Sequence, residues 1–284
     1  MSADSLRIVV ICGVKPLADP LVEKLRKLGH DPVALLTPRR RPDAPPRPAF
    51  LDLTDASAPP GLDLLLPRDK FSVEPLVRAY EPDLVVCWGF PWKIPLAALE
   101  APRRGSINMH PGMLPRHRGP VPLAWALRDG DKEWGTTWHY MDAELDTGNL
   151  LAQGSVPIED DDADIAAFGQ KLTASAIGLL PRALERVLAG DPGDVQPEEG
   201  VTWAGHFEDD DYARIDWSHP ARAIHNQVRA WHLTFGLSGL RAPVAGIDGE
   251  DVVVLQTRLT DPGEGARRVE CGDGPIWVVA TEPV

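Results

Sequence analysis

The sequence predicts an α/β fold, with a Rossmann-like, mostly parallel sheet and a small β-rich part near the C-terminus. Residues 6–13 form a near-continuous apolar run that ends in glycine, which is typical of a buried parallel strand. A helical pattern over 20–28 and a short strand over 32–36 complete a β–α–β opening. Strands separated by turns are expected later at 251–255 and 276–280.

The alternation of helices and strands continues through the first part of the chain. The first helix is expected to begin with Pro20 in its first turn and to end at Gly29. A short strand is expected at 62–66, followed by a helix that Ser72 caps. The apolar segment 83–89 predicts another buried strand, which its glycine stops.

The middle of the chain predicts two more strands around a rigid loop. Residues 106–110 form a short strand, and a loop rich in proline and glycine leads from it to a helix that ends at Gly130. Residues 135–141 are β-branched and aromatic, as expected of a strand. An edge strand is expected at 156–158.

A long helix that ends at Leu188 comes next, and Pro181 predicts a kink or a break in it. Its acidic start suits the positive end of the helix dipole and lacks the ligand spacing of a calcium loop. The acidic residues concerned are Asp160, Asp161, Asp162 and Asp164.

A stretch rich in proline, glycine and acidic residues after this helix predicts a domain boundary. We expect a catalytic domain over 1–190, a linker over 191–204 and a small β-rich domain over 205–284. A short helix with Ile224, Val228 and Trp231 on one stripe opens the second domain.

Composition limits the function. The chain of 284 residues carries 29 basic and 42 acidic residues, a formal net charge of −13, and residues 205–284 hold seven basic against thirteen acidic ones. This balance argues against a nucleic-acid substrate without excluding a local basic patch. No apolar stretch is long enough to span a membrane, no signal peptide precedes the first strand, and the three cysteines lie far apart. A cytoplasmic protein with buried free thiols is expected.

The residues that carry chemistry gather between 106 and 146. Side chains two apart in a strand share a face, so Asn108 and His110 are expected to point the same way. An amide and an imidazole on one face, followed by a rigid loop rich in proline and glycine, predict the rim of an active site. An amide can donate to an oxyanion, and an imidazole can move a proton near neutral pH. A carboxylate such as Asp146 can orient the imidazole and raise its pKa.

Two motifs in this region resemble those of the folate-dependent formyltransferases. The first is the run from Asn108 through His110-Pro-Gly and Leu-Pro to Arg118-Gly, and the second is the Asp-rich loop 142–149. The family includes methionyl-tRNA formyltransferases, amino-sugar N-formyltransferases and formyltetrahydrofolate hydrolases. Residues 215–230 also resemble the start of the C-terminal domain of the first two, which implies a small, OB-like barrel here.

The resemblance implies roles for individual residues. It makes Asn108, His110 and Asp146 catalytic, and it implies 10-formyltetrahydrofolate as cosubstrate with no metal. The predicted folate-binding residues follow two strands: Trp88, Gly89, Phe90, Trp92, Lys93, Ile94, Met141, Asp142, Glu144 and Leu145. Met113, Arg116 and His117 are predicted to contact the substrate, while Arg118 is expected to brace the fold. We interpret His139, His225 and His232 as structural.

The predicted acceptor is a primary amine of a small molecule, such as an amino-sugar nucleotide or an amino acid. Methionyl-tRNA is the first alternative, favoured by the basic loop around Arg39, Arg40 and Arg41, which falls where that family contacts tRNA. The alternative, non-functional interpretation of this basic segment is a solvated surface loop. The second alternative is a formyltetrahydrofolate hydrolase, in which water replaces the amine. A folate-binding scaffold with an inactive site is a further alternative, and the presence of Asn108, His110 and Asp146 argues against it. The sequence leaves open whether the protein forms a homodimer.

Overall fold

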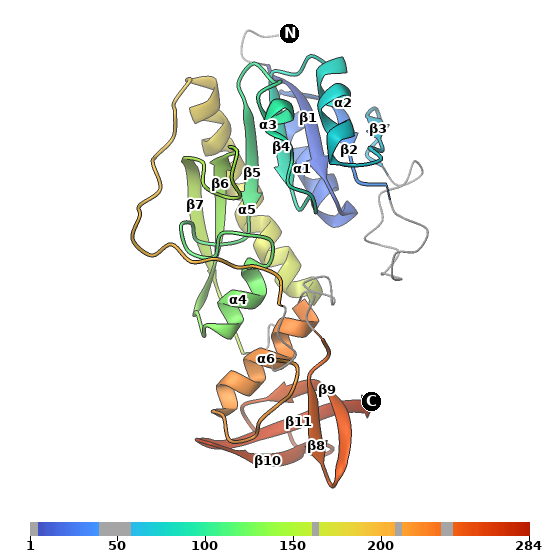
Figure 1. Cartoon of the computed structure of the whole chain (residues 1–284), viewed down its shortest axis with the longest axis vertical. Coiled ribbons are helices and arrows are strands. Elements are labelled where there is room, and N and C mark those ends of the chain that lie inside the picture. Colours follow the sequence, from blue (N-terminus) through green and yellow to red (C-terminus); the bar gives the residue numbers. More distant parts are fainter. Residues whose placement is uncertain (1–4, 40–57, 161–164, 208–211, 234–240) are drawn as a thin grey trace. The chain divides into compact units, whose positions relative to one another are not determined.

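The protein is described from a computed structural model, which covers residues 5–39, 58–160, 165–207, 212–233 and 241–284 (Figure 1). A sheet of seven strands has the order β3-β2-β1-β4-β5-β6-β7. The strands β1 to β5 pair in parallel, and β6 pairs antiparallel with β5. The mostly parallel α/β sheet that the sequence predicts is therefore confirmed. Its strands are β1 (Arg7–Cys12), β2 (Asp31–Leu36), β3 (Asp63–Leu65), β4 (Leu84–Trp88), β5 (Ser106–His110), β6 (Glu133–Tyr140) and β7 (Leu150–Pro157).

Alternate residues of the central strands enter two different cores. In β1, Ile8 and Val10 join a cluster with α1 (Lys15–Lys27) and α5 (Ile165–Leu188). Val9 and Ile11 point to the other face, where α2 (Val73–Ala79) and α3 (Leu96–Leu99) cover the sheet. Burial on both faces explains why these strands are continuously apolar in sequence.

One expected helix start is wrong, and one expected helix cap forms no side-chain bond. The helix α1 begins at Lys15, with Pro16 in its first turn and Pro20 inside it, so the earlier proline marks the start. Ser72 precedes α2 but makes no side-chain cap bond there. Instead, Asp69 accepts hydrogen bonds from the backbone N–H and the hydroxyl of Ser72, which caps a 3-10 turn (Lys70–Ser72).

The edge strand and the long helix differ in extent from the expectation. The edge strand β7 begins at Leu150, six residues earlier than expected, and it does lie at the edge of the sheet. Pro181 lies inside α5, which continues as one helix to Leu188. Asp161, Asp162 and Asp164, predicted to open this helix, lie outside the described residues, as do Arg40 and Arg41 of the basic loop.

The chain divides into two compact units that share segments. Unit 1 comprises Met1–Pro115, Gly135–Gly154 and Thr173–Gly200, and unit 2 comprises Arg116–Trp134, Ser155–Leu172 and Val201–Val284. Both β6 and α5 begin in unit 2 and end in unit 1. The predicted boundary between residues 190 and 205 remains a prediction about domains.

Unit 2 contains the predicted β-rich part. An antiparallel sheet of order β10-β11-β9-β8 packs against α6 (Ala221–Leu233), with Ile224, Val228 and Val254 in the shared core (Figure 1). The strands are β8 (Val244–Ile247), β9 (Glu250–Arg258), β10 (Arg267–Cys271) and β11 (Gly274–Pro283). The helix α4 (Pro122–Arg128) also contacts α6. In this contact the Asn226 amide donates a hydrogen bond to the Leu127 carbonyl at 2.9 Å.

His225 is a buried structural residue, as expected. Its Nε2 is 2.9 Å from the carbonyl oxygen of Asp160, which can only accept, so Nε2 carries a proton. Its Nδ1 is 2.8 Å from the Thr257 hydroxyl. Burial, together with the nearby Arg229 charge, lowers the pKa of His225 to about 4, so the imidazole is neutral at physiological pH.

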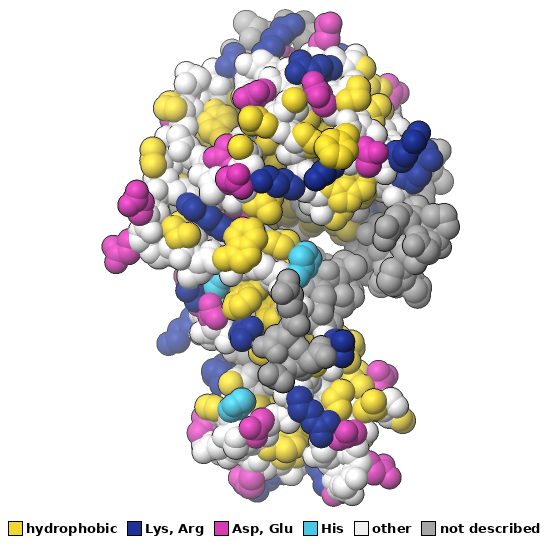
Figure 2. Space-filling view, viewed as in Figure 1, with side chains coloured by type: hydrophobic (Ala, Val, Ile, Leu, Met, Phe, Trp, Pro, Cys, Tyr) yellow, Lys and Arg dark blue, Asp and Glu magenta, His cyan; other side chains and the backbone are white. Residues whose placement is uncertain are grey.

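The cysteines and the surface bear on the protein's environment. Cys12 and Cys87 are free and buried in the seven-stranded sheet, and burial raises the pKa of Cys12 to about 12 and that of Cys87 further. Basic and acidic side chains are interspersed over the face shown in Figure 2. Within the described residues, no helix combines the length and apolarity needed to cross a bilayer.

Candidate active site

The strand β5 carries the first two predicted catalytic residues. Ile107 and Met109 point into the core, while Asn108 and His110 share the other face, as the strand period requires. His110 is buried, with 3% of its surface exposed. The sequence expectation for the direction of these side chains is thus met.

Asp146 joins them from the loop after β6. Its carboxylate Oδ2 is 3.4 Å from His110 Nδ1, and its Oδ1 is 3.4 Å from His139 Nε2. An ion pair forms at these separations only where the imidazole is protonated, and both separations exceed the usual length of a charge-assisted hydrogen bond. Asp146 has a φ of 58°, a left-handed conformation that aspartate tolerates better than most residues. The structure therefore brings the three predicted catalytic residues together.

His139 also belongs to this cluster, although the sequence indicated only a structural role. It lies opposite Asn108 in the β5–β6 ladder, and its Nε2 is 3.2 Å from the Asn108 amide nitrogen. Its Nδ1 is 2.7 Å from the carbonyl oxygen of Tyr140. In the sequence, only the position of His139 in an alternating strand pointed to this site. That position cannot be interpreted until the pairing register of the strand is known.

The loop after β5 is held against β6 and β7. A Cβ at Gly135 would lie 2.0 Å from the backbone nitrogen of Met113, so only glycine allows this approach. Thr137 Oγ1 donates to the Gly112 carbonyl at 2.6 Å, and the Gln153 amide donates to the Leu114 carbonyl at 2.8 Å. Met113, a predicted substrate contact, is 37% exposed on this fixed loop.

Arg116 and His117, the other predicted substrate contacts, lie in unit 2 and bind acidic side chains. Arg116 contacts Asp131 at 2.8 Å and Asp129 at 3.0 Å, and His117 Nε2 is 2.7 Å from Asp131. Burial alone would raise the pKa of Asp131, but hydrogen bonds from Arg116 and His117 outweigh it and hold that pKa below its usual range. This pairing indicates a bracing role, and the substrate role stays a prediction.

Arg118 braces the same loop through its backbone. Its N–H donates to the Thr202 carbonyl at 3.0 Å, and its carbonyl accepts from the Ala204 N–H at 2.6 Å. A Cβ at Gly119 would lie 2.8 Å from the Ala204 carbonyl oxygen, so this stretch of unit 2 is closely packed.

The two segments predicted to bind folate meet in unit 1. Lys93 of the loop after β4 forms a 3.0 Å ion pair with Glu144 of the loop after β6. Phe90 and Trp92 pack edge to face with ring centroids 5.3 Å apart, and both are half-buried, which leaves apolar surface for a flat heteroaromatic ring.

The remaining predicted folate residues divide by exposure. Trp88 is 1% exposed and packs edge to face on Trp138 in the core, so only its backbone is available to a ligand. Ile94 is buried, Met141 and Leu145 are half-buried, and Gly89 and Asp142 are exposed. Asp142 accepts hydrogen bonds from the Glu144 N–H and the Thr147 hydroxyl, which shapes the loop before Asp146.

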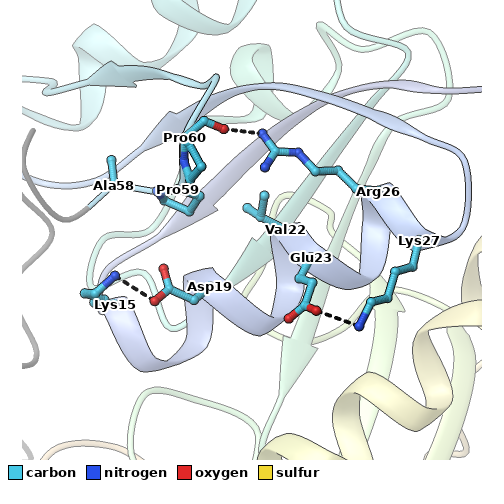
Figure 3. Close-up of a pocket in the computed structure, with 9 residues that line it drawn as sticks. All are labelled: Lys15, Asp19, Val22, Glu23, Arg26, Lys27, Ala58, Pro59 and Pro60. Carbon is cyan, nitrogen blue, oxygen red and sulfur yellow. Dashed lines mark hydrogen bonds and ion pairs between the residues drawn. The ribbon is translucent and has the colours of Figure 1, made fainter.

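Neither a metal centre nor the groove beside α1 forms a second candidate site within the described residues. Among the described residues, no group of three or more His, Cys, Asp or Glu side chains has the geometry of a metal site. A groove of about 530 Å³ lies between α1 and residues 58–60 (Figure 3). Its charged side chains pair within the chain, as Lys15 with Asp19 at 2.6 Å and Arg26 with the Pro60 carbonyl at 2.6 Å, so it lacks the marks of an active site.

Comparison with known proteins identifies the family. Residues 7–184 match the formyl transferase family, and the chain belongs to it. The methionyl-tRNA formyltransferase of Ruegeria pomeroyi is 33% identical over 287 residues, which cover 95% of this chain and 90% of that protein. The enzyme of the same name from Geobacillus thermodenitrificans is 34% identical over 229 residues, covering 79% of this chain and 71% of that one.

Solved structures share the fold at low identity. An N-formyltransferase from Helicobacter canadensis, in complex with folinic acid and dTDP-3-aminofucose, superposes with a TM-score of 0.72 at 16% identity, over 98% of this chain and 100% of that chain. HypX from Aquifex aeolicus, in complex with tetrahydrofolic acid, gives 0.66 at 20% identity, over 97% of this chain and 44% of that chain.

Proposed function

We propose that this enzyme transfers the formyl group of 10-formyltetrahydrofolate to the amine of methionyl-tRNA. The observation that carries the acceptor is the 33% identity to a methionyl-tRNA formyltransferase over 95% of the chain, so the match extends beyond the catalytic motifs into the C-terminal part. Those relatives favour methionyl-tRNA over the small-molecule amine that we predicted first from the charge.

The folate segments support the cosubstrate. Bound there, 10-formyltetrahydrofolate supplies the formyl carbon as acyl donor and leaves as tetrahydrofolate. The half-buried rings of Phe90 and Trp92 fit its pterin, and the Lys93–Glu144 ion pair holds the two loops on which it would rest. Buried free thiols at Cys12 and Cys87 fit an enzyme of the reducing cytoplasm.

Asn108 is the donor for the oxygen that gains charge. One N–H of its amide faces His139 Nε2 at 3.2 Å, and the second remains for the formyl oxygen. An amide donates without changing charge, and it is fixed in place before the reaction, which is what oxyanion stabilisation requires. Removing one such donor in other enzymes costs about 100-fold to 1,000-fold in kcat.

His110 and Asp146 manage the amine proton. The new bond forms between the amine nitrogen and the formyl carbon, the bond from that carbon to the folate nitrogen breaks, and one proton passes from the amine to that nitrogen. The carboxylate of Asp146, 3.4 Å from His110 Nδ1, orients the imidazole, and the two groups relay the proton in transit. Neither His110 nor Asp146 is consumed, so both return to their starting state at the end of each turnover.

A small-molecule amine is the second candidate acceptor, and charge favours it. The net charge is −13, and residues 205–284 hold thirteen acidic against seven basic residues, which weakens binding to a phosphate backbone. Basic side chains are also interspersed with acidic ones in Figure 2.

The test is release of tetrahydrofolate from 10-formyltetrahydrofolate, without acceptor and with methionyl-initiator tRNA or a panel of amino-sugar nucleotides and amino acids. We expect release that requires the charged tRNA and disappears in His110→Ala. Release only with a small amine would establish the second candidate. Release without any acceptor would make the protein a hydrolase, and no release under any condition would refute the proposal.

A further inference from the structure

The segment that follows α5 in sequence begins the predicted linker, and its first six residues bind to other parts of unit 1. We call residues Asp191–Gln196 the strap. Arg186, near the end of α5, binds Asp191 at 2.7 Å and Asp194 at 2.7 Å through different nitrogens. These hydrogen bonds raise the pKa of Arg186 and lower those of both aspartates, so all three groups are charged at neutral pH.

The strap lies along the edge strand β7. Leu150 and Asp194 exchange two backbone hydrogen bonds of 2.8 and 2.9 Å, and the Asn149 amide donates to the Pro192 carbonyl at 2.9 Å. A Cβ at Gly193 would lie 2.9 Å from both the Asn149 Cβ and the Leu150 carbonyl oxygen. The close approach therefore depends on glycine, and the strap covers the sheet edge just after the loop that carries Asp146.

Gln196 ends the strap, and its amide reaches into that loop. Its Nε2 donates one N–H to the carbonyl of Asp146 at 2.9 Å and the other to the carbonyl of Gly148 at 2.8 Å. Gln196 is 7% exposed, so water has little access to replace these bonds. Both carbonyls belong to the turn in which Asp146 adopts its left-handed conformation.

We propose that Gln196 is a positioning residue for formyl transfer, which holds the backbone around Asp146 so that the carboxylate faces His110 and His139 together. The inference rests on the proposed function. A single side chain here fixes both carbonyls of a turn whose carboxylate must stay 3.4 Å from two imidazoles. Catalytic groups lose much of their effect when displaced by as little as 1 Å, so a relaxed turn slows the reaction while folate and acceptor still bind.

Gln196→Met tests the proposal, because methionine keeps the length and volume and removes both donors. We expect kcat to fall about 10-fold to 100-fold while KM for folate and for the acceptor changes less than about threefold. The imidazole NMR signals of His110 and His139 should move toward those of Asp146→Asn. A variant that is only destabilised would leave these signals in place.

Thr136→Val is the matched control. It removes a buried hydroxyl that contacts the Gly154 carbonyl and the Ser175 hydroxyl in the same unit, so it should lower the melting temperature without changing kcat. Val195→Ala, at a strap side chain that is 79% exposed, should change neither. If Gln196→Met does not fold, Gln196→Ala replaces it, since it leaves room for water at the two carbonyls.

Three outcomes would overturn the positioning role: kcat of the Gln196 variant within twofold of wild type, an equal loss of kcat in Thr136→Val, or unmoved imidazole signals. The two kinetic outcomes presuppose a wild-type protein that transfers formyl groups. A wild-type protein that releases no tetrahydrofolate with any acceptor would refute the proposed function instead, so the two failures are distinguishable.

Discussion

His139 and Asn108 lie opposite each other in the β5–β6 ladder, and the Asn108 amide nitrogen is 3.2 Å from His139 Nε2. The Tyr140 carbonyl, 2.7 Å from His139 Nδ1, can only accept, so Nδ1 carries a proton. In a neutral imidazole, Nε2 then accepts a hydrogen bond from the Asn108 side chain. This bond fixes which end of the amide group is the nitrogen and which is the oxygen. Protonation of Nε2 would favour Asp146 as its partner and remove this constraint.

This geometry predicts that His139→Phe loses catalysis more than binding. Phenylalanine keeps a buried ring but cannot accept from Asn108, so the amide can rotate and present its oxygen to the formyl group. We expect kcat to fall about 10-fold to 100-fold with little change in KM, measured by steady-state tetrahydrofolate release. His219→Phe, at an exposed histidine, is the control, and equal kcat in the two variants would argue against an orienting role.

Gly148→Ala should disable the loop that carries Asp146. A Cβ there would lie 1.9 Å from the Tyr140 carbonyl oxygen, so the backbone must shift. We expect a loss of kcat of more than about 100-fold and a lower melting temperature. Gly178→Ala is the matched control on α5, where an added Cβ meets nothing within 4 Å. It should gain about 0.5–1 kcal/mol in the free energy of unfolding, and the prediction fails if Gly148→Ala behaves likewise.

The ion pairs of Arg116 predict a structural effect. Arg116→Gln and Asp131→Asn should each lower the free energy of unfolding by about 1–2 kcal/mol, with a coupling of about 1 kcal/mol in the double variant, because the two groups share hydrogen bonds. Urea unfolding of the four proteins measures this coupling. A rise in KM for the acceptor in Arg116→Gln, without that coupling, would restore the substrate role that the sequence predicted.

His225 predicts a pH dependence of stability. Its pKa is about 4 in the folded protein and near the ordinary 6.5 in the unfolded chain, so the unfolded chain binds more protons between these values. Stability is therefore complete above about pH 6.5 and decreases as the pH falls toward 4, by at most about 3 kcal/mol from this residue.

Urea unfolding at pH 7 and pH 5 checks this dependence. His225→Gln, which can still donate to the Asp160 carbonyl, should be less stable than wild type at pH 7 and should lose less stability on going to pH 5. His219→Gln, at the protein surface, serves as control. An unchanged difference between the two pH values in His225→Gln would contradict the assignment.

The parts of the structure that local patterns determine could be predicted from sequence. Apolar runs located the central strands, and alternation in β5 gave the common direction of Asn108 and His110. Helix starts were less determined, because Pro16 and Pro20 both suit a first turn and only the packing of α1 distinguishes them.

The residues of the candidate site that could not be predicted from sequence join it through long-range pairing. His139 joins the site through the register of β5 with β6, and no local pattern encodes that register. Gln196 lies in a segment whose proline, glycine and acidic content resembles a linker. Its importance comes from hydrogen bonds to residues about fifty positions earlier in the chain.

The positions of the three cysteines have a practical consequence. Cys12 and Cys87 lie within the sheet of unit 1, while Cys271 ends β10 in unit 2 and is half-exposed. A thiol-reactive dye will therefore label Cys271 in the native protein and reach the other two only when the sheet opens. Labelling rates of Cys12 and Cys87 thus report on the opening of the sheet in unit 1, with Cys271 as an internal reference, and peptide mapping assigns them.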